Sequence, residues 1–136
     1  MAFTLSYCDP LHPAPLELGA KEPEQILQFF RQVPWEAALA KLTDTPPEAV
    51  HCSASVDVKN SVTQEAVCIS AVGEPADYAF HVFYIRPKRI RRFWGLYTEQ
   101  QPAYMSELLD QPVDRAVHIL HTLLRNDSAQ LESLFG

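Results

Sequence analysis

The sequence predicts an α+β fold: a mainly antiparallel sheet of four to five strands, with N-terminal and C-terminal helices packed on one side. Two observations predict it. Segments in the middle of the chain have the hydrophobic pattern of strands and follow one another without a helix between them. Helical patterns lie only before and after these segments. The chain has 136 residues and contains no internal repeat or low-complexity tract, so we expect a single domain spanning residues 1–136.

The start of the chain predicts one short strand and a loop. Residues 3–7 (FTLSY) alternate apolar and polar side chains, which is the pattern of a strand with one buried face. Residues 9–19 (DPLHPAPLELG) contain three prolines within six positions. Because proline fixes φ and lacks an amide proton, we expect this second segment to be an extended surface loop.

Two helical pieces follow the loop. Residues 21–33 (KEPEQILQFFRQV) place Pro23 in the first turn of a helix, where a missing amide proton is tolerated. The apolar stripe of this helix comprises Ile26, Leu27, Phe30 and Val33. Pro34 ends or kinks the helix, and residues 34–42 (PWEAALAKL) predict a second piece that buries Trp35, Leu39 and Leu42.

The central segments predict four strands. Residues 51–60 (HCSASVDVKN) alternate most clearly, with Cys52, Ala54, Val56 and Val58 on one face. Residues 64–72 (QEAVCISAV) are nearly all small or apolar. Residues 78–85 (YAFHVFYI) are apolar on both faces apart from His81, so we expect a central strand there. Residues 90–98 (IRRFWGLYT) predict the fourth strand, after a charged connection.

The C-terminal segments predict two helices. A helical signal extends over residues 101–124, and its apolar stripe comprises Val113, Ala116, Val117, Leu120, Leu123 and Leu124. Asn126 and Asp127 interrupt the pattern. Residues 128–135 (SAQLESLF) predict a last short helix with Ser128 as its N-cap.

A basic cluster, RPKRIRR at residues 86–92, stands out in an acidic chain. The net charge of the chain is −6, and without the five basic residues of the cluster the remainder has 6 basic and 17 acidic residues, a net charge of −11. A field of that sign repels nucleic acid at long range, and one short run contacts few phosphates. The cluster is therefore interpreted either as a charged link that protects a sheet edge or as a socket for a carboxylate-bearing partner. Trp94 and Tyr97 follow it, and an exposed tryptophan beside arginines is a typical anchor for a protein partner.

Several classes of protein are disfavoured by what the sequence contains. Three cysteines (Cys8, Cys52 and Cys68) are too few for a disulfide scaffold, and two of them fall on predicted strands, so we expect packed free thiols and a reducing compartment. No apolar run is long enough to cross a membrane, and the first residues lack the pattern of a signal peptide. These observations predict a cytoplasmic protein without a membrane partner.

No constellation of residues predicts catalysis, a cofactor or a metal. His118 and His121 lie three positions apart on a predicted helix, but they lack the HExxH form and a third ligand at a matching offset. A cysteine paired with His12, His51 or His81 has no family signature around it. The four glycines form no phosphate-binding loop. We therefore expect no catalytic, cofactor-binding or metal site.

The layout of the whole chain resembles that of the small acidic immunity proteins of bacterial polymorphic-toxin and type VI secretion systems. The resemblance rests on an opening extended segment, the helix EPEQILQFFRQVPW, a run of strands through YAFHVFYI and the closing helix DRAVHILHTLL. It implies a non-enzymatic cytosolic protein that binds one cognate toxin and blocks its active site or its assembly. It includes no specific motif and assigns no functional residue.

The leading expectation is thus an inhibitor that occludes a toxin or effector protein, as a monomer or weak homodimer that binds no nucleic acid. Two surfaces remain open for the partner. One combines the basic cluster with its aromatic neighbours, namely Arg89, Arg91, Arg92, Trp94 and Tyr97. The other consists of carboxylates near the strand turns, namely Asp57, Glu65, Glu74 and Asp77, which suit a basic cleft. The alternatives are a small chaperone or adaptor for a secreted effector, and a small enzyme without a recognisable motif.

Overall fold

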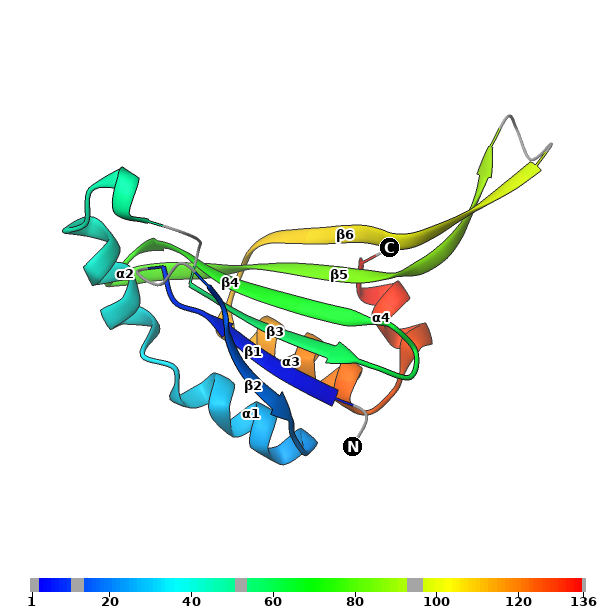
Figure 1. Ribbon diagram of the computed structural model, residues 1–136, viewed down its shortest axis with the longest axis horizontal. Coiled ribbons are helices and arrows are strands. Elements are labelled where there is room, and N and C mark those ends of the chain that lie inside the picture. The colour runs from blue at the N-terminus through cyan, green and yellow to red at the C-terminus, as the bar shows by residue number, and fades with distance from the viewer. Residues whose placement is uncertain (1–2, 11–13, 51–53, 93–96, 136) are drawn as a thin grey trace.

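The computed structural model describes residues 3–10, 14–50, 54–92 and 97–135, and for residues 88–92 and 97–102 it describes the backbone alone. One antiparallel sheet has the strand order β2-β1-β3-β4-β5-β6 (Figure 1). The strands are β1 (Phe3–Cys8), β2 (Leu16–Ala20), β3 (Ser55–Asn60), β4 (Ala66–Glu74), β5 (Asp77–Arg92) and β6 (Tyr97–Gln111). The helices are α1 (Pro23–Gln32), α2 (Trp35–Thr43), the short 3₁₀ helix η1 (Pro47–Ala49), α3 (Val113–Leu124) and α4 (Ser128–Phe135).

The core lies between one face of the sheet and the helices. Alternate residues of the three central strands are fully or almost fully buried on this face, including Val56, Val58, Val67, Ile69, Val82 and Tyr84. They pack in one cluster with Phe30 of α1 and Leu120 of α3. The rings of Phe30, Trp35 and Phe80 meet at centroid distances of 5.3 to 5.6 Å, so the break between α1 and α2 lies directly over the sheet. The alternation predicted for Ala54, Val56 and Val58 is confirmed, whereas Cys52 lies outside the described residues.

Helices α1, α2 and α4 lie where the sequence predicts, whereas the first part of the predicted long C-terminal helix is a strand instead. The predicted N-cap of α4 is wrong: Ser128 is the first helical residue, and the Asp127 carboxylate accepts a hydrogen bond of 3.1 Å from the Gln130 amide. In α1, the Gln25 side chain accepts a hydrogen bond of 2.9 Å from the Glu22 amide, and Pro23 occupies the first turn. Pro34 separates α1 from α2 as expected. Among the described residues, no helix is long and apolar enough to cross a membrane.

The predicted α+β class is confirmed, but the number of strands is wrong: the sheet has six. The additional strand is β2, which the proline-rich pattern assigned to a loop. Leu16 and Glu17 pair with Tyr7 and Ser6 of β1, because the prolines precede this stretch and leave its amide protons available. A shift in register between Leu5 and Ser6 and a positive φ of 77° at Gly19 accommodate the pairing.

The largest error concerns residues 101–111, where we predicted the beginning of a helix and the structure has strand β6. Half-buried Tyr104, Ser106 and Leu108 alternate along it and stand opposite β5 residues on the core face. Pairing with the long β5 therefore overrides the local helical pattern. The strand ends near Asp110, whose φ of 55° is positive, and α3 begins only after Pro112.

The basic cluster is not a link between strands, because residues 86–92 continue β5. Of the predicted fourth strand, residues 90–92 belong to β5, residues 97–98 belong to β6, and residues 93–96 lie outside the described part. The ladder between β4 and β5 stops at the pair Ala66 and Ile85. Beyond that pair β5 is hydrogen-bonded to β6 alone, so the two strands form a ribbon. We call residues 86–92 with 97–104 the arm, and Figure 1 shows it extending away from the rest of the sheet.

Cys8, at the end of β1, is disulfide-bonded, whereas Cys68 is free. The expectation of free thiols throughout is therefore wrong at Cys8. The predicted reducing compartment loses this part of its support.

Candidate partner-binding surfaces

The arm gathers the basic residues proposed for partner binding. Its backbone register pairs Lys88 with Gln101, Arg89 with Gln100, Arg91 with Thr98 and Arg92 with Tyr97. Four basic residues thus lie within five positions of β5, and the part of β6 that pairs with them, residues 97–101, has one acidic residue, Glu99. Trp94 lies outside the described residues, and Tyr97 is the first residue of β6.

Arg86, the first residue of the basic cluster, is buried at the base of the arm, with a relative exposure of 4%. Its guanidinium donates two hydrogen bonds to the Glu132 carboxylate of α4, at 2.8 and 2.9 Å. Further hydrogen bonds reach the Ser106 hydroxyl at 2.8 Å and the Tyr84 carbonyl at 3.2 Å. The same group lies over the rings of Tyr84 and Tyr104, at 4.3 and 4.8 Å from their centroids. Arg86 therefore holds α4 against the beginning of the arm.

A second polar group lies next to this ion pair. Glu65 is 6% exposed and its carboxylate accepts hydrogen bonds from the hydroxyls of Tyr84, at 2.5 Å, and Ser128, at 2.8 Å. Burial, followed by the hydrogen bond to Glu65, raises the pKa of Tyr84 well above its ordinary value. The hydroxyl therefore stays protonated and donates. This group connects the β3–β4 turn, β5 and the start of α4.

The four candidate carboxylates do not form one surface. Asp57 lies on the sheet face that faces away from the core, Glu65 is buried, and Glu74 and Asp77 stand opposite each other where β4 turns into β5. Glu65 and Glu74 flank opposite ends of β4, about 30 Å apart for an extended strand. They do not reach one cleft together.

Asp57 and Cys68 are directly opposite each other in the β3–β4 ladder. Burial raises the pKa of Asp57, and a hydrogen bond from Cys68 opposes part of that shift. Burial, and then the Asp57 charge, raise the pKa of the Cys68 thiol far above its ordinary value. A thiol held protonated in this way is a poor nucleophile. His81 is engaged elsewhere, since its Nδ1 accepts a hydrogen bond of 3.2 Å from the Asp110 amide.

The two helix histidines are both exposed on α3. Within the part of the chain that the structure describes, no group of three or more His, Cys, Asp or Glu side chains is placed to hold a metal ion. Among the described residues, no third ligand is therefore placed to complete a metal site with His118 and His121.

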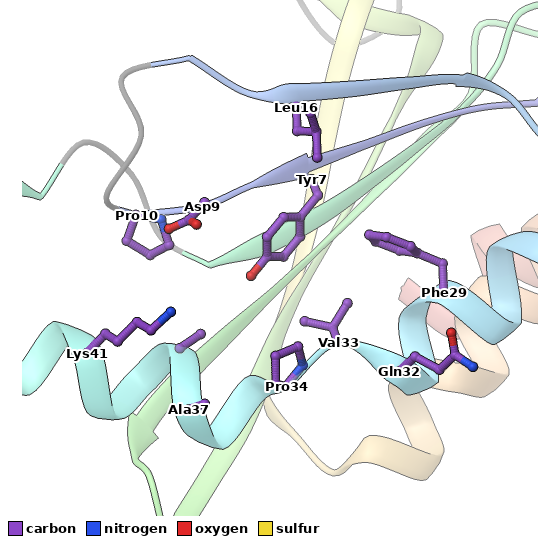
Figure 2. Close-up of a pocket in the computed structure, with 11 residues that line it drawn as sticks. Tyr7, Asp9, Pro10, Leu16, Phe29, Gln32, Val33, Pro34, Ala37 and Lys41 are labelled. Atoms are coloured by element: carbon purple, nitrogen blue, oxygen red, sulfur yellow. The ribbon is translucent and has the colours of Figure 1, made fainter.

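A cavity of about 420 Å³, which the sequence did not predict, lies between β1, β2 and the junction of α1 with α2. Figure 2 shows Tyr7 in its centre, with Leu16 and Phe29 on its apolar sides and Asp9 and Lys41 at its polar end. The break at Pro34 was visible in the sequence. The strand β2, which closes the opposite side of the cavity, was predicted to be a loop, so the sequence did not predict a pocket there.

Comparison of the chain with protein-family models, with curated proteins and with solved structures finds no match in any of the three.

Proposed function

We propose that the chain is a non-enzymatic binding protein, an immunity protein that neutralises a cognate secreted toxin by occluding it, and that the arm is the surface that binds the toxin. The observation that carries this proposal is the arm itself. It is a basic two-stranded ribbon of β5 and β6 that extends past the point where β4 stops pairing with β5.

Stability gives the first reason. An isolated two-stranded ribbon is marginal in water, because it buries little apolar surface. Its outer edges also present amide and carbonyl groups that another chain can pair with. Beyond Ile85, no third strand pairs with the arm among the residues that the structure describes. A partner that covers the ribbon would supply the missing contacts, which favours the arm as a contact surface.

Charge gives the second reason. The arm carries Lys88, Arg89, Arg91 and Arg92 on a chain whose net charge is −6. An acidic partner is repelled by most of this chain and attracted at the arm, so the field orients the encounter. Arginine is also the charged residue most enriched at the energetic centres of protein interfaces. The partner that fits is a folded protein with an acidic surface.

Anchoring gives the third reason. The base of the arm is fixed by the buried Arg86, which pairs with Glu132 of α4 and packs between two tyrosine rings. A ribbon that is held at its base loses less conformational freedom on binding than a loop does.

The test compares two charge-reversed triple variants. The arm variant carries Arg89→Glu, Arg91→Glu and Arg92→Glu, and the matched control carries Lys21→Glu, Lys59→Glu and Arg115→Glu elsewhere on the chain. The partner is captured from nuclease-treated lysate of the source cells, identified, purified and titrated against each variant. We expect the arm variant to lose affinity at least tenfold while the control stays within about threefold, with both melting temperatures nearly unchanged. Equal affinities for the two variants, or capture that depends on nucleic acid, would refute the proposal.

A chaperone or adaptor for a secreted effector is the second candidate, and the free edge of β6 favours it. This edge strand exposes Met105 at 55% and Leu109 at 49%, which suits an extended client segment added to the sheet. Sizing chromatography and binding of an unfolded client separate the two functions. A dimer that holds an extended segment supports the chaperone; a monomer that binds only a folded partner supports the immunity protein.

A further inference from the structure

The cavity beside α1 and α2 carries a second inference, which does not depend on the arm. The cavity is bounded by Tyr7 of β1 and Leu16 of β2 on the sheet side, and by α1, α2 and their junction on the helical side (Figure 2). Its volume of about 420 Å³ lies in the range of small-molecule sites.

The local sequence explains why the cavity is open. Pro34 ends α1 and redirects the chain, and the first turns of α2 present only methyl groups at Ala37 and Ala38. No side chain from this stretch is long enough to fill the space. The remaining walls include the ring of Phe29, which meets Tyr7 edge to face at a centroid distance of 6.0 Å. The interior is therefore apolar and partly aromatic.

The polar end of the cavity has two hydrogen-bond donors, Tyr7 and Lys41, and one carboxylate, Asp9. Figure 2 shows the Tyr7 hydroxyl and the Lys41 ammonium group pointing toward each other across the cavity. No described residue forms a hydrogen bond with the Tyr7 hydroxyl. Burial, and then the negative charge of Asp9, raise the pKa of Tyr7, so the hydroxyl remains a donor at neutral pH. Asp9 itself is engaged in an interaction within the chain.

We propose that this cavity binds a small monocarboxylic acid with an apolar body, whose carboxylate accepts a hydrogen bond from Tyr7 and pairs with Lys41. Two donors, one of them cationic, match the two oxygens of a carboxylate. The apolar walls take an aliphatic or aromatic body. The proposal concerns a ligand of this fold and holds whether or not the arm binds a toxin.

The first experiment uses three probes with the same tail and different head groups. Octanoate, octanol and octylamine are titrated into the full-length protein by isothermal titration calorimetry at neutral pH. We expect octanoate to bind most tightly, about threefold to tenfold more tightly than octanol, and octylamine to bind most weakly. Equal affinity for octanoate and octanol, or tighter binding of octylamine, would overturn the carboxylate assignment. Absence of binding by all three would overturn the ligand site and leave the cavity to a side chain of a partner protein.

The second experiment locates the octanoate. Lys41→Met keeps most of the aliphatic stem and removes the charge, and Tyr7→Phe keeps the ring and removes the hydroxyl. Each is expected to weaken octanoate about threefold to tenfold while octanol binding stays the same. Lys59→Met, on the sheet face away from the core, is the control and should change neither affinity. Because these replacements conserve volume, their melting temperatures should remain close to that of the wild type. Loss of octanoate and octanol binding in equal measure would contradict the proposed contacts.

Discussion

Replacing Arg86 tests whether the base of the arm is held by the buried ion pair. Arg86→Met keeps an unbranched side chain between the Tyr84 and Tyr104 rings and removes the charge. The replacement abolishes two hydrogen bonds to the Glu132 carboxylate, one to the Ser106 hydroxyl and one to the Tyr84 carbonyl. We expect the free energy of unfolding to fall.

The magnitude follows from the exposure of the two partners. The Arg86 side chain is 5% exposed and the Glu132 side chain is 41% exposed. Breaking a fully buried pair costs about 3–5 kcal/mol, because the remaining charge is left without a partner. Here the Glu132 carboxylate regains water, so we expect about 2–3 kcal/mol for Arg86→Met. For Glu132→Gln, which keeps a hydrogen-bond acceptor near the guanidinium, we expect about 1–2 kcal/mol.

The assay is urea denaturation of the two single variants and the double variant, followed by far-UV circular dichroism. A shift of the midpoint at constant m-value reports the change in stability. The double-mutant cycle should give a coupling free energy of about 1 kcal/mol between Arg86 and Glu132. A coupling indistinguishable from zero, or a cost below about 0.5 kcal/mol for Arg86→Met, would refute the reasoning.

Three further predictions concern the core and the sheet face away from it. Phe30→Ala and Leu120→Ala, at positions 1% and 0% exposed, should cost about 3–5 and 2–5 kcal/mol in urea denaturation; costs near zero would mean that these helix faces are not buried. The pKa of Asp57 is raised in the folded state above its ordinary value of 3.8, so the folded state binds its proton more strongly and stability falls as pH rises through and above that value. Asp57→Asn should therefore stabilise the protein more at pH 7 than at pH 3, and thermal melts that show an equal gain at both would contradict this sign. Cys68, whose thiol pKa is raised, should react with iodoacetamide more slowly than free cysteine at pH 7.5, as mass spectrometry of the labelled peptide would show; reaction at the rate of free cysteine would contradict the burial argument.

The sequence predicted what depends on local patterns. The alternation in residues 54–58 and most of the apolar stripes of α1 and α3 lie on the buried faces, as predicted. Val113 is the error in the α3 stripe: it is the first residue of the helix and is 50% exposed. The breaks at Pro34 and Pro112 are where helices end or begin, because the ring chemistry of proline acts within one residue of its position.

The errors occurred where pairing decides the structure. Residues 101–111 have a helical pattern on their own and form β6 because the long β5 offers them a ladder. Residues 16–20 became β2 for the same reason, beside β1. Both surfaces of interest depend on these strands, since β6 completes the arm and β2 closes one side of the cavity. Composition and charge therefore pointed to the basic cluster without revealing that it lies on a projecting ribbon.

Tertiary contacts also give two of the residues singled out in the sequence, Arg86 and Glu65, roles that differ from those of their sequence neighbours. Arg86 belongs to the basic run in sequence, yet in the structure it is a buried anchor for α4. Glu65, predicted to lie near a strand turn and to suit a basic cleft, is buried and accepts hydrogen bonds from Tyr84 and Ser128. Neither role follows from sequence spacing, since each partner lies at least 19 positions away.

Hydrogen exchange in the presence of the purified partner tests the central proposal most directly. Amides of the arm, in residues 86–92 and 97–104, are measured by mass spectrometry with and without a saturating amount of partner. If the arm is the binding surface, these amides should exchange more slowly in the complex, with the largest protection beyond Ile85, where the ribbon has no third strand. Unchanged exchange in the arm, with protection confined to the turns at Glu65 and Glu74 or to the cavity beside α2, would contradict the account.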